Sequence, residues 1–407
     1  MSMESSTRPV AGKPVEGAPP RARVPRSEHD YTEGMAAQRR AFALERTGAD
    51  LSHLAHYDFD PALVSGNIEN FIGVAQVPVG LAGPLRVHGE HAEGDFYVPL
   101  ATTEGTLVAS YNRGMRVLAA SGGVRATVVE RSMQRSPVFI FPDAVAAREF
   151  GRWVEEHLGG IRAAAQATTR TGKLVEIGQY QVGPLRYLRF NYTTGDAAGQ
   201  NMTGKATLAA CQWIKAHHPG PLQFLLSGNI DTDKKHSQIN TLLTRGRRVV
   251  AEAVLRKEAL EQMVGASPRE FFRHRQVSIA GSFLAGASNN GAHAANALAA
   301  LFIATGQDVA NVAESHAGIT YSQLLDDGDY YWSVTLPSLI VATYGGGTGL
   351  PTQKQCLALL GCCGPGTADK LAEICAAVVL AGEISLAGAV LHGDWVSAHE
   401  RLGRNRK

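Results

Sequence analysis

The spacing of apolar and polar residues changes several times along the chain. Residues 1–27 are rich in Ser, Pro, Gly and Arg with almost no periodic apolar pattern, so we expect a disordered tail there. From 28 to 54 apolar residues recur at helical spacing, which predicts one or two short helices. The next segment, 69–85, mixes β-branched residues with Pro and Gly, a pattern typical of short strands joined by close turns.

Strands and helices then alternate. The pattern predicts strands at 96–100, 138–141, 173–180 and 186–190, and helices at 103–120 (beginning near Glu104), 144–158 and 201–217. The part of this order that begins at 138 indicates a small α+β unit. Beyond Pro221 the pattern changes to long Ala-rich helices separated by Gly clusters, including 292–305 and 368–391.

The composition is that of a compact protein. With 407 residues and 44% hydrophobic content, the chain can bury a large core and divide into two or three domains. The 39 Lys and Arg residues nearly balance 37 Asp and Glu residues, which argues against a nucleic-acid partner. The 44 glycines and the low aromatic content of 7% favour packed helices and close turns, hence an α/β or α+β fold.

Cysteine spacing and hydropathy indicate the cellular compartment of the protein. The five cysteines are odd in number and no pair has zinc-ligand spacing, so we expect no metal site and a reducing compartment. The N-terminus has no apolar secretory core. The most apolar stretch, 374–391, is interrupted by Glu383 and is more typical of a buried helix than of a membrane span. We therefore expect a cytoplasmic protein without a membrane partner.

Several acidic and basic residues could carry chemistry. Asp233, Lys234 and Lys235 end the run SGNIDTDKK; a lysine can stabilise a developing oxyanion, although a DKK triplet alone is most often a solvated turn. Glu104 in ATTEG is either an acid at a helix start or a proton donor to a carbonyl oxygen. Asp308 in GQD follows an apolar helix, whose C-terminal dipole gives a carboxylate no stabilisation.

Histidines and glycine-rich turns add further candidates. His293 and Asn296 lie three apart and share a helix face that could meet an elongated ligand such as an acyl-CoA, or could simply complete a core. His399, in an Arg-rich tail, is either solvated or a mobile acid. The run TGDAAGQN at 194–201 precedes a helix, where backbone N–H groups could face a pyrophosphate. The glycines at 345–347 are a second such candidate, although a tight turn alone explains them.

Eleven motifs, taken in order, resemble those of the hydroxymethylglutaryl-CoA (HMG-CoA) reductase family. They run from Glu69 to the C-terminus and are ENFIG, PVGLAGPL, ATTEG, NRG, TGDAAGQN, SGNIDTDKK, GAHAAN, GQD, YGGGTGLP, GEISLAG and the late AH. Their order is far more specific than any one of them. The resemblance implies an α+β fold, with a large α/β domain around a long central helix and an inserted, ferredoxin-like small domain that binds the nucleotide.

The resemblance also implies a reaction. It is the four-electron reduction of (S)-3-hydroxy-3-methylglutaryl-CoA to (R)-mevalonate and CoA with two NADPH, a step of isoprenoid biosynthesis. Four catalytic residues follow, Glu104, Lys234, Asp308 and His399. Lys234 would stabilise the oxyanion and His399 would protonate the departing thiolate. Glu104 would assist the reduction of bound mevaldehyde, and Asp308 would tune the lysine and glutamate.

Binding residues come from the same resemblance. Those for the hydroxymethylglutaryl group are Arg135, Ser227, Asn229, Asp233, Lys235, His293 and Asn296. Those for CoA are Ser110, Asn112, Arg113 and Arg116. Those around the nicotinamide nucleotide are Thr169, Arg170, Asp196, Gly199, Gln200 and Asn201. Arg170 could pair with a 2′-phosphate, and this nucleotide string looks more like the NADPH-using class than the NADH-using one.

Three positions depart from the family's pattern. Where the family usually offers a lysine for the free carboxylate of the substrate, this chain has Gln276 or Val277, with Arg275 nearby. Gln200 and Ile340 are smaller departures. The missing lysine leaves open a reductase of another acyl-CoA. A non-catalytic acyl-CoA-binding member is the other alternative, against which the intact catalytic residues argue.

The implied organisation has several parts. A helical segment at 28–54 precedes a large substrate-binding domain at 55–136 and 226–385, with a small NADP-binding domain at 137–225 between its two parts. A C-terminal flap at 386–407 would carry His399. The resemblance implies a homodimer or higher oligomer with shared active sites and ENFIG at the interface. It also implies a soluble, prokaryotic-type member without the membrane half of animal members.

Overall fold

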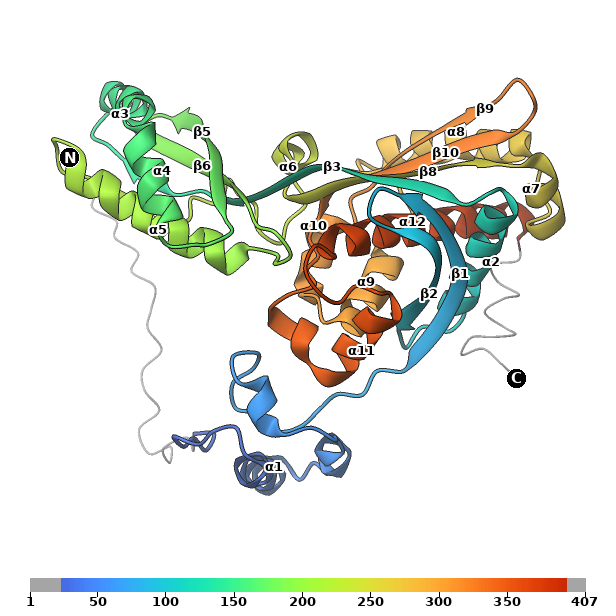
Figure 1. The fold of residues 1–407 in the computed structure, drawn as a ribbon, viewed down its shortest axis with the longest axis horizontal. Coiled ribbons are helices and arrows are strands. Elements are labelled where there is room, and N and C mark those ends of the chain that lie inside the picture. Colours follow the sequence, from blue (N-terminus) through green and yellow to red (C-terminus); the bar gives the residue numbers. More distant parts are fainter. Residues whose placement is uncertain (1–22, 394–407) are drawn as a thin grey trace, which may run out of the picture. The chain divides into compact units, whose positions relative to one another are not determined.

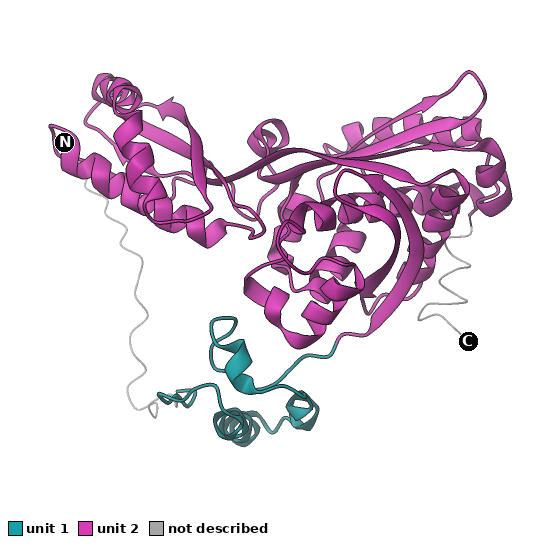
Figure 2. Ribbon diagram, viewed as in Figure 1, with its two compact units in different colours: residues 1–76 teal, residues 77–407 magenta. Residues whose placement is uncertain are grey.

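The computed structural model describes residues 23–393, and the chain forms two compact units, residues 1–76 and 77–407 (Figure 2). The first unit holds helix α1 (Glu33–Thr47) and the 3₁₀ turns η1 (Ser52–Ala55) and η2 (Pro61–Val64). Thr32 begins α1 by accepting the backbone N–H of Met35, and Gly48, with a φ of 70°, ends it. The tail expected at 1–27 lies outside the described residues except for 23–27, which form neither helix nor strand.

The second unit is organised around one sheet, which has ten strands in the described residues. Neighbours follow the order β7-β4-β6-β3-β8-β10-β9, while β1 pairs with β2 and β3, and β5 pairs with β6. The strands are β1 (Val79–Gly89), β2 (Glu93–Ala101), β3 (Val124–Arg135), β4 (Val138–Ile140), β5 (Lys173–Val182), β6 (Leu185–Thr193), β7 (Gln223–Leu225), β8 (Gly246–Leu255), β9 (Ile319–Leu324) and β10 (Tyr330–Leu339).

Strand β3 joins the two ends of this sheet (Figure 1). Its first part pairs with β1 and β8, whereas residues 133–135 at its end pair with β6. Each end of the sheet has its own apolar core. The larger core packs β1–β3, β8 and β10 against helices, and the smaller one lies within 139–222.

Helices cover both ends of the sheet. Those of the larger end are α2 (Leu107–Ala120), α7 (Lys257–Met263), α8 (Pro268–Leu284), α9 (Ala294–Thr305), α10 (Val312–Ser315), α11 (Pro351–Leu359) and α12 (Ala368–His392). Those of the smaller end are α3 (Ala144–Glu156), α4 (Leu158–Gln166) and α5 (Gln200–His217). The connections carry α6 (Gln238–Leu243), η3 (Val309–Asn311) and η4 (Gly346–Gly349).

Helix α12 runs through the larger core and is buried over most of its 25 residues. Among the described helices it is the one that is long and apolar enough to cross a membrane, yet 83% of its apolar stretch is buried inside the protein. Burial on all sides explains its continuous apolar sequence, as predicted for 374–391. Its neighbour α2 comes very close, since a Cβ added at Gly114 would lie 1.8 Å from the carbonyl oxygen of Ala381.

The mixed α+β class is confirmed, but four predictions about elements are wrong. The segment 69–85 does not form short strands joined by turns, since residues 69–78 are in neither helix nor strand and one strand, β1, begins at Val79. Helix α2 begins at Leu107 and not near Glu104, because Thr106 has a left-handed φ of 75°. The helix predicted at 144–158 ends at Glu156, and a second helix, α4, follows it. The Ala-rich helices predicted beyond residue 221 are right for α9 and α12, whereas strands β8, β9 and β10 are missing from the prediction.

Candidate active site

The site is built around the segment 227–235, which we call the lysine loop, between β7 and α6. Three of its non-glycine residues have positive φ: Asn229 at 64°, Thr232 at 51° and Lys234 at 56°. Each such residue costs about 1–3 kcal/mol and persists only where its surroundings fix it. Here Asn240 donates to the carbonyl of Asp231 at 3.2 Å and to the Thr232 hydroxyl at 2.7 Å. The loop is therefore held in a strained shape.

Lys234 and Asp308 form an ion pair at the surface of this loop. Their Nζ and Oδ2 atoms are 2.9 Å apart, and the side chains are 44% and 42% exposed. Asp308 begins η3 by accepting the backbone N–H of Ala310 at 3.1 Å, so its carboxylate is fixed. The hydrogen bond from Lys234 to Asp308 raises the pKa of the lysine. The result is an accessible ammonium group that stays charged and can meet a substrate oxygen.

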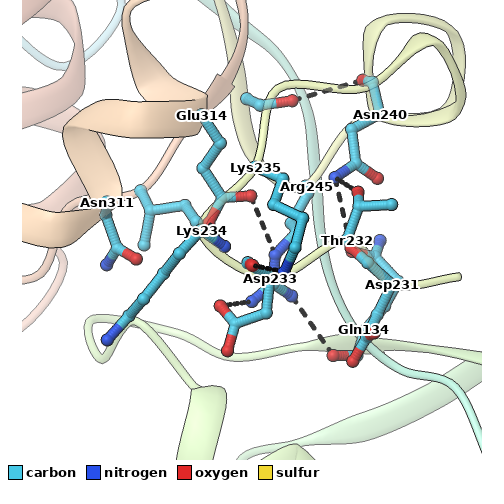
Figure 3. A network of polar contacts seen from close by, with 12 residues as sticks. Gln134, Asp231, Thr232, Asp233, Lys234, Lys235, Asn240, Arg245, Asn311 and Glu314 are labelled. Carbon is cyan, nitrogen blue, oxygen red and sulfur yellow. Dashed lines mark hydrogen bonds and ion pairs between the residues drawn. The ribbon is translucent and has the colours of Figure 1, made fainter. Parts of the chain in front are cut away.

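A buried ionic network lies beneath Lys234 (Figure 3). Arg245 is fully buried; it donates to Glu314 at 3.0 Å and to Asp233 at 2.6 Å. Glu314 also accepts the backbone N–H of Lys234 at 3.2 Å. Burial raises the pKa of Glu314 to about 7, against the opposing effect of Arg245. Figure 3 shows the ammonium of Lys234 extending away from this network, while its backbone stays attached to it.

Gln200 connects this network to the smaller core. It is the first residue of α5, and its side-chain amide donates to Asp233 at 3.2 Å and to Asn311 at 3.0 Å. Arg135, at the end of β3, connects that strand to the lysine loop through an ion pair with Asp231 at 3.2 Å. Gln200, predicted to bind the nucleotide, and Arg135, predicted to bind the substrate, therefore both contact the lysine loop.

A second cluster forms where α2, α9 and α12 meet. Arg113 donates to the hydroxyl of Ser385 at 3.1 Å and to its carbonyl at 2.8 Å, and Ser110 lies 3.0 Å from the same hydroxyl. His293 lies 3.4 Å from Ser110 and 3.3 Å from the amide of Asn296. Burial lowers the pKa of His293 to about 4, so its ring is neutral near pH 7. Four predicted substrate residues are thus brought together.

Glu383 fixes the backbone of His293. Its carboxylate is buried, and it accepts the backbone N–H groups of Ala292 at 2.8 Å and His293 at 2.7 Å at the start of α9. Tyr111 donates to the carbonyl of His293 at 2.8 Å and stacks on its ring at 4.9 Å. These contacts fix the orientation of the imidazole at the point where the three helices meet. Its two ring nitrogens then face Ser110 and Asn296.

The predicted nucleotide residues surround the start of α5. Gly199 has a φ of 85° and begins the helix, and a Cβ there would lie 2.1 Å from the side chain of Thr194. Asp196 accepts the N–H groups of Gly366 at 2.8 Å and Ala368 at 3.1 Å, so its carboxylate caps α12. Arg170 is exposed and has no hydrogen-bond or ion-pair partner among the described residues.

Other predicted site residues are not joined to these clusters. Glu104 is exposed in the turn before α2, and within residues 23–393 no hydrogen bond or ion pair joins its side chain to Lys234 or Asp308. His399 lies outside the described residues. Asn112 accepts the backbone N–H of Gly83 at 2.8 Å, and Thr169 accepts that of Gly172 at 3.0 Å. The remaining predicted residues are exposed: Ser227, Asn229, Lys235, Arg116 and Asn201.

The structure shows where the residues lie that stand in place of the family's carboxylate-binding lysine. Gln276 and Val277 are exposed on α8. Arg275 is buried, donates to the Asn290 carbonyl at 3.2 Å and to the Thr320 hydroxyl, and lies over the Trp332 ring. The guanidinium of Arg275 is therefore occupied by contacts inside the core, and it does not replace the missing lysine.

Sequence reasoning missed the residues that support Lys234 and His293 from the interior, namely Arg245, Glu314, Asn311, Glu383, Ser385 and Tyr111. A signal was present for two of them. Glu314 is a carboxylate in the otherwise weakly polar run NVAES, and Glu383 interrupts an apolar helix. A charged residue in such a setting is buried only with partners.

An accessible, charged lysine with a fixed aspartate partner, in an α+β fold with two cores, defines an enzyme that can stabilise a negative substrate oxygen. The family model of hydroxymethylglutaryl-coenzyme A reductase matches residues 35–404. The chain belongs to this family.

Relatives match along most of the chain. It is 47% identical over 378 residues to 3-hydroxy-3-methylglutaryl-coenzyme A reductase of Aeropyrum pernix, covering 91% of this chain and 90% of that protein. It is 43% identical to the enzyme of Pyrococcus abyssi, covering 91% and 93%. A solved structure of the class II enzyme of Streptococcus pneumoniae bound to NADPH has a TM-score of 0.66 at 21% identity, covering 81% and 89% of the two chains. At that identity the structure bears on the fold alone.

Proposed function

We propose that this chain reduces 3-hydroxy-3-methylglutaryl-CoA to mevalonate in the mevalonate pathway of isoprenoid biosynthesis. Two NADPH and two protons are consumed, and two NADP⁺ and free CoA are formed. The observation that carries the proposal is the accessible Lys234–Asp308 ion pair, in a chain 47% identical to the reductase of Aeropyrum pernix.

Lys234 is proposed to stabilise the substrate oxygen in both reductions. As hydride reaches the thioester carbon, its oxygen becomes negative, and a fixed ammonium stabilises that charge better than water does. Asp308 supports this role in two ways. It holds the Nζ atom at 2.9 Å, and it raises the pKa of Lys234, so the lysine remains a proton donor.

Glu104 and His399 are proposed to handle the other protons. His399 would protonate the CoA thiolate as it leaves, and Glu104 would assist the reduction of mevaldehyde. The family resemblance supports both roles. Glu104 is exposed in a turn at the start of α2, so it can reach a bound substrate.

Substrate contacts are proposed around the two clusters. Arg135, Ser227, Asn229, Asp233, Lys235, His293 and Asn296 would hold the hydroxymethylglutaryl group, and Ser110, Asn112, Arg113 and Arg116 would hold CoA. The contacts of Ser110 with His293 and of Arg113 with Ser385 support a continuous binding surface for an elongated ligand.

NADPH fits the residues around the start of α5. The 18-residue helix presents free N–H groups at its N-terminus, which favour a phosphate. Arg170 is exposed and available for a 2′-phosphate. Thr169, Gly199, Gln200 and Asn201 would complete the site, while Asp196 would shape the loop by capping α12. When bound, NADPH supplies the hydride in both reductions.

We further propose the domain organisation that the sequence predicts. A small NADP-binding domain at 137–225 is supported by the separate core within 139–222. The core around α12, which includes residues from Ala82 onward, supports the large domain predicted at 55–136 and 226–385, whereas residues 55–76 belong to the first compact unit. Helix α12 continues to His392, so the proposed flap at 386–407 begins within it. A cytoplasmic homodimer or higher oligomer with shared active sites completes the proposal.

The test is a measurement of stoichiometry. Purified protein is given HMG-CoA with NADPH, or with NADH in parallel, and mevalonate and free thiol are quantified. Two NADPH oxidised for each mevalonate and each CoA are expected. Lys234→Ala, which lacks the ammonium group, serves as the negative control and should lose nearly all hydride transfer.

The outcomes separate the candidate functions. Faster turnover of another CoA thioester would replace HMG-CoA as the substrate, and the exposed Gln276 is then the first position to examine. Binding of CoA esters without oxidation of NADPH or NADH would reject the catalytic assignment. Near-normal turnover by a folded Lys234→Ala variant would reject the role of the lysine.

A further inference from the structure

The short segment 308–314 contacts both the ammonium group and the backbone N–H of Lys234. Asp308, at the start of η3, binds its ammonium group at 2.9 Å. Glu314, in α10, accepts its backbone N–H at 3.2 Å. The two carboxylates therefore come from residues only six apart in the sequence, on the same side of the lysine loop.

The backbone contact matters because Lys234 is strained. Its φ of 56° lies in the left-handed region, which side-chain-bearing residues adopt only when other contacts fix them. The hydrogen bond to a carboxylate is stronger than one to a neutral acceptor. If it were lost, the backbone could relax to negative φ, and the Cβ and the ammonium would then point in another direction.

Glu314 has no direct access to a substrate. It is 1% exposed, and its second oxygen pairs with the fully buried Arg245. Arg245 in turn holds Asp233, the residue before Lys234, at 2.6 Å. Glu314 thus holds the backbone of Lys234, and Arg245 holds the side chain of Asp233, from the interior of the protein.

We propose that Glu314 is a positioning residue, which holds the strained backbone of Lys234 so that its ammonium faces the reacting carbonyl. The inference rests on the proposed function and adds a residue to it. Glu314 has no access of its own to the substrate, so its loss should act through the lysine loop, lower kcat in both reductions and leave the binding of NADPH unchanged.

The ionisation of Glu314 supplies a distinctive readout. Arg245 and the N–H of Lys234 favour its charged form, whereas burial and Asp233 favour the neutral form, and its pKa is raised to about 7. Protonation below that pH weakens the acceptor. The wild-type kcat should therefore fall as the pH drops through about 7. Glu314→Gln keeps an acceptor oxygen that does not titrate, so this acid limb should disappear.

The experiment measures the reduction of mevaldehyde by NADPH, which needs no protonation of a leaving thiolate. Glu314→Ala should lower kcat by about 10- to 100-fold, the cost of a small misplacement of a catalytic group. Glu314→Gln should lose less, about 5-fold or under above the acid limb. The KM for NADPH should stay within about two-fold in both variants.

Glu373→Gln is the matched control. Glu373 is also a buried carboxylate that accepts backbone N–H groups, those of His91 at 2.9 Å and Ala92 at 2.7 Å. In the part of the chain that the structure describes, no hydrogen bond or ion pair joins it to the lysine loop. It should be destabilised to a similar degree while keeping its kcat and its acid limb.

Wild-type kcat in a folded Glu314→Ala variant would overturn the inference, as would an acid limb that persists in Glu314→Gln. Should Glu314→Ala fail to fold, the pH profile of Glu314→Gln decides alone. A wild-type protein that reduces neither HMG-CoA nor mevaldehyde would instead overturn the proposed function.

Discussion

Replacing Gly114 with alanine tests how closely α2 must approach α12. Within a helix this change ordinarily stabilises a protein by about 0.5–1 kcal/mol, because alanine loses less backbone entropy on folding. Here the new Cβ would lie 1.8 Å from the carbonyl oxygen and 2.5 Å from the carbonyl carbon of Ala381, whereas ordinary contacts are 3.4–4 Å. The helices must therefore move apart. Overpacking of this kind costs about 1–3 kcal/mol, so we expect a loss of about 2 kcal/mol.

The same movement should reach the proposed CoA site. Ser385 of α12 binds Arg113 and Ser110 of α2 over 2.8–3.1 Å, and these short bonds do not survive a separation of the helices. The assays are urea unfolding and steady-state kinetics. The free energy of unfolding should fall and the KM for HMG-CoA should rise, while the KM for NADPH changes little.

Gly159→Ala is the matched control. Gly159 lies in helix α4, and an added Cβ there would meet no atom within 4 Å. This variant should be as stable as the wild type or more stable by about 0.5 kcal/mol. If Gly114→Ala matched Gly159→Ala in stability and in KM, the close packing of α2 on α12 would not have the consequence inferred here.

Three further changes probe the site. Asp308→Asn removes the partner that raises the pKa of Lys234, so the alkaline limb of kcat should move to lower pH; an unmoved limb would contradict the pairing. Gln200→Ala removes two hydrogen bonds of 3.0 and 3.2 Å and should raise the KM for NADPH by about 5- to 30-fold, and an unchanged KM would reject the link between α5 and the lysine loop. His399→Gln should slow reduction of the thioester but spare that of added mevaldehyde, so equal losses in both would refute its role as the acid.

The sequence predicted the exposed charged residues of the site better than the buried residues that hold them in place. Lys234 and Asp308 were predicted from the family resemblance, with an unusual local setting at Asp308 alone, and the structure pairs them at 2.9 Å. Arg245 could not be singled out, because its partner Glu314 lies 69 residues away and no local pattern reports such a contact. Glu314 carried a local signal, as a carboxylate in a weakly polar run, but that signal does not identify its partner. Asp196 shows the same limit, since it caps a helix that begins 172 residues later.

Local patterns predicted elements where neighbours in sequence decide them. The continuous apolar run of α12 is of this kind. The strands β8 and β10 differ, because each forms by pairing with a strand far away in the sequence, residues 247–255 with 330–339. The start of α2 was misplaced because the positive φ of Thr106 is imposed by its surroundings.

The sharing of β3 between the two cores has a consequence for engineering this protein. Cutting out 137–225 as a fragment would leave 133–135 without their partner and would expose the edge of β6, which invites edge-to-edge aggregation. Deleting one residue from β3 would be equally harmful. Side chains alternate between faces with a period of two, so the strand would be out of phase with β6 at one end or with β8 at the other. The two halves are therefore not interchangeable modules, and a chimera between relatives should exchange β3 together with β6 and β8.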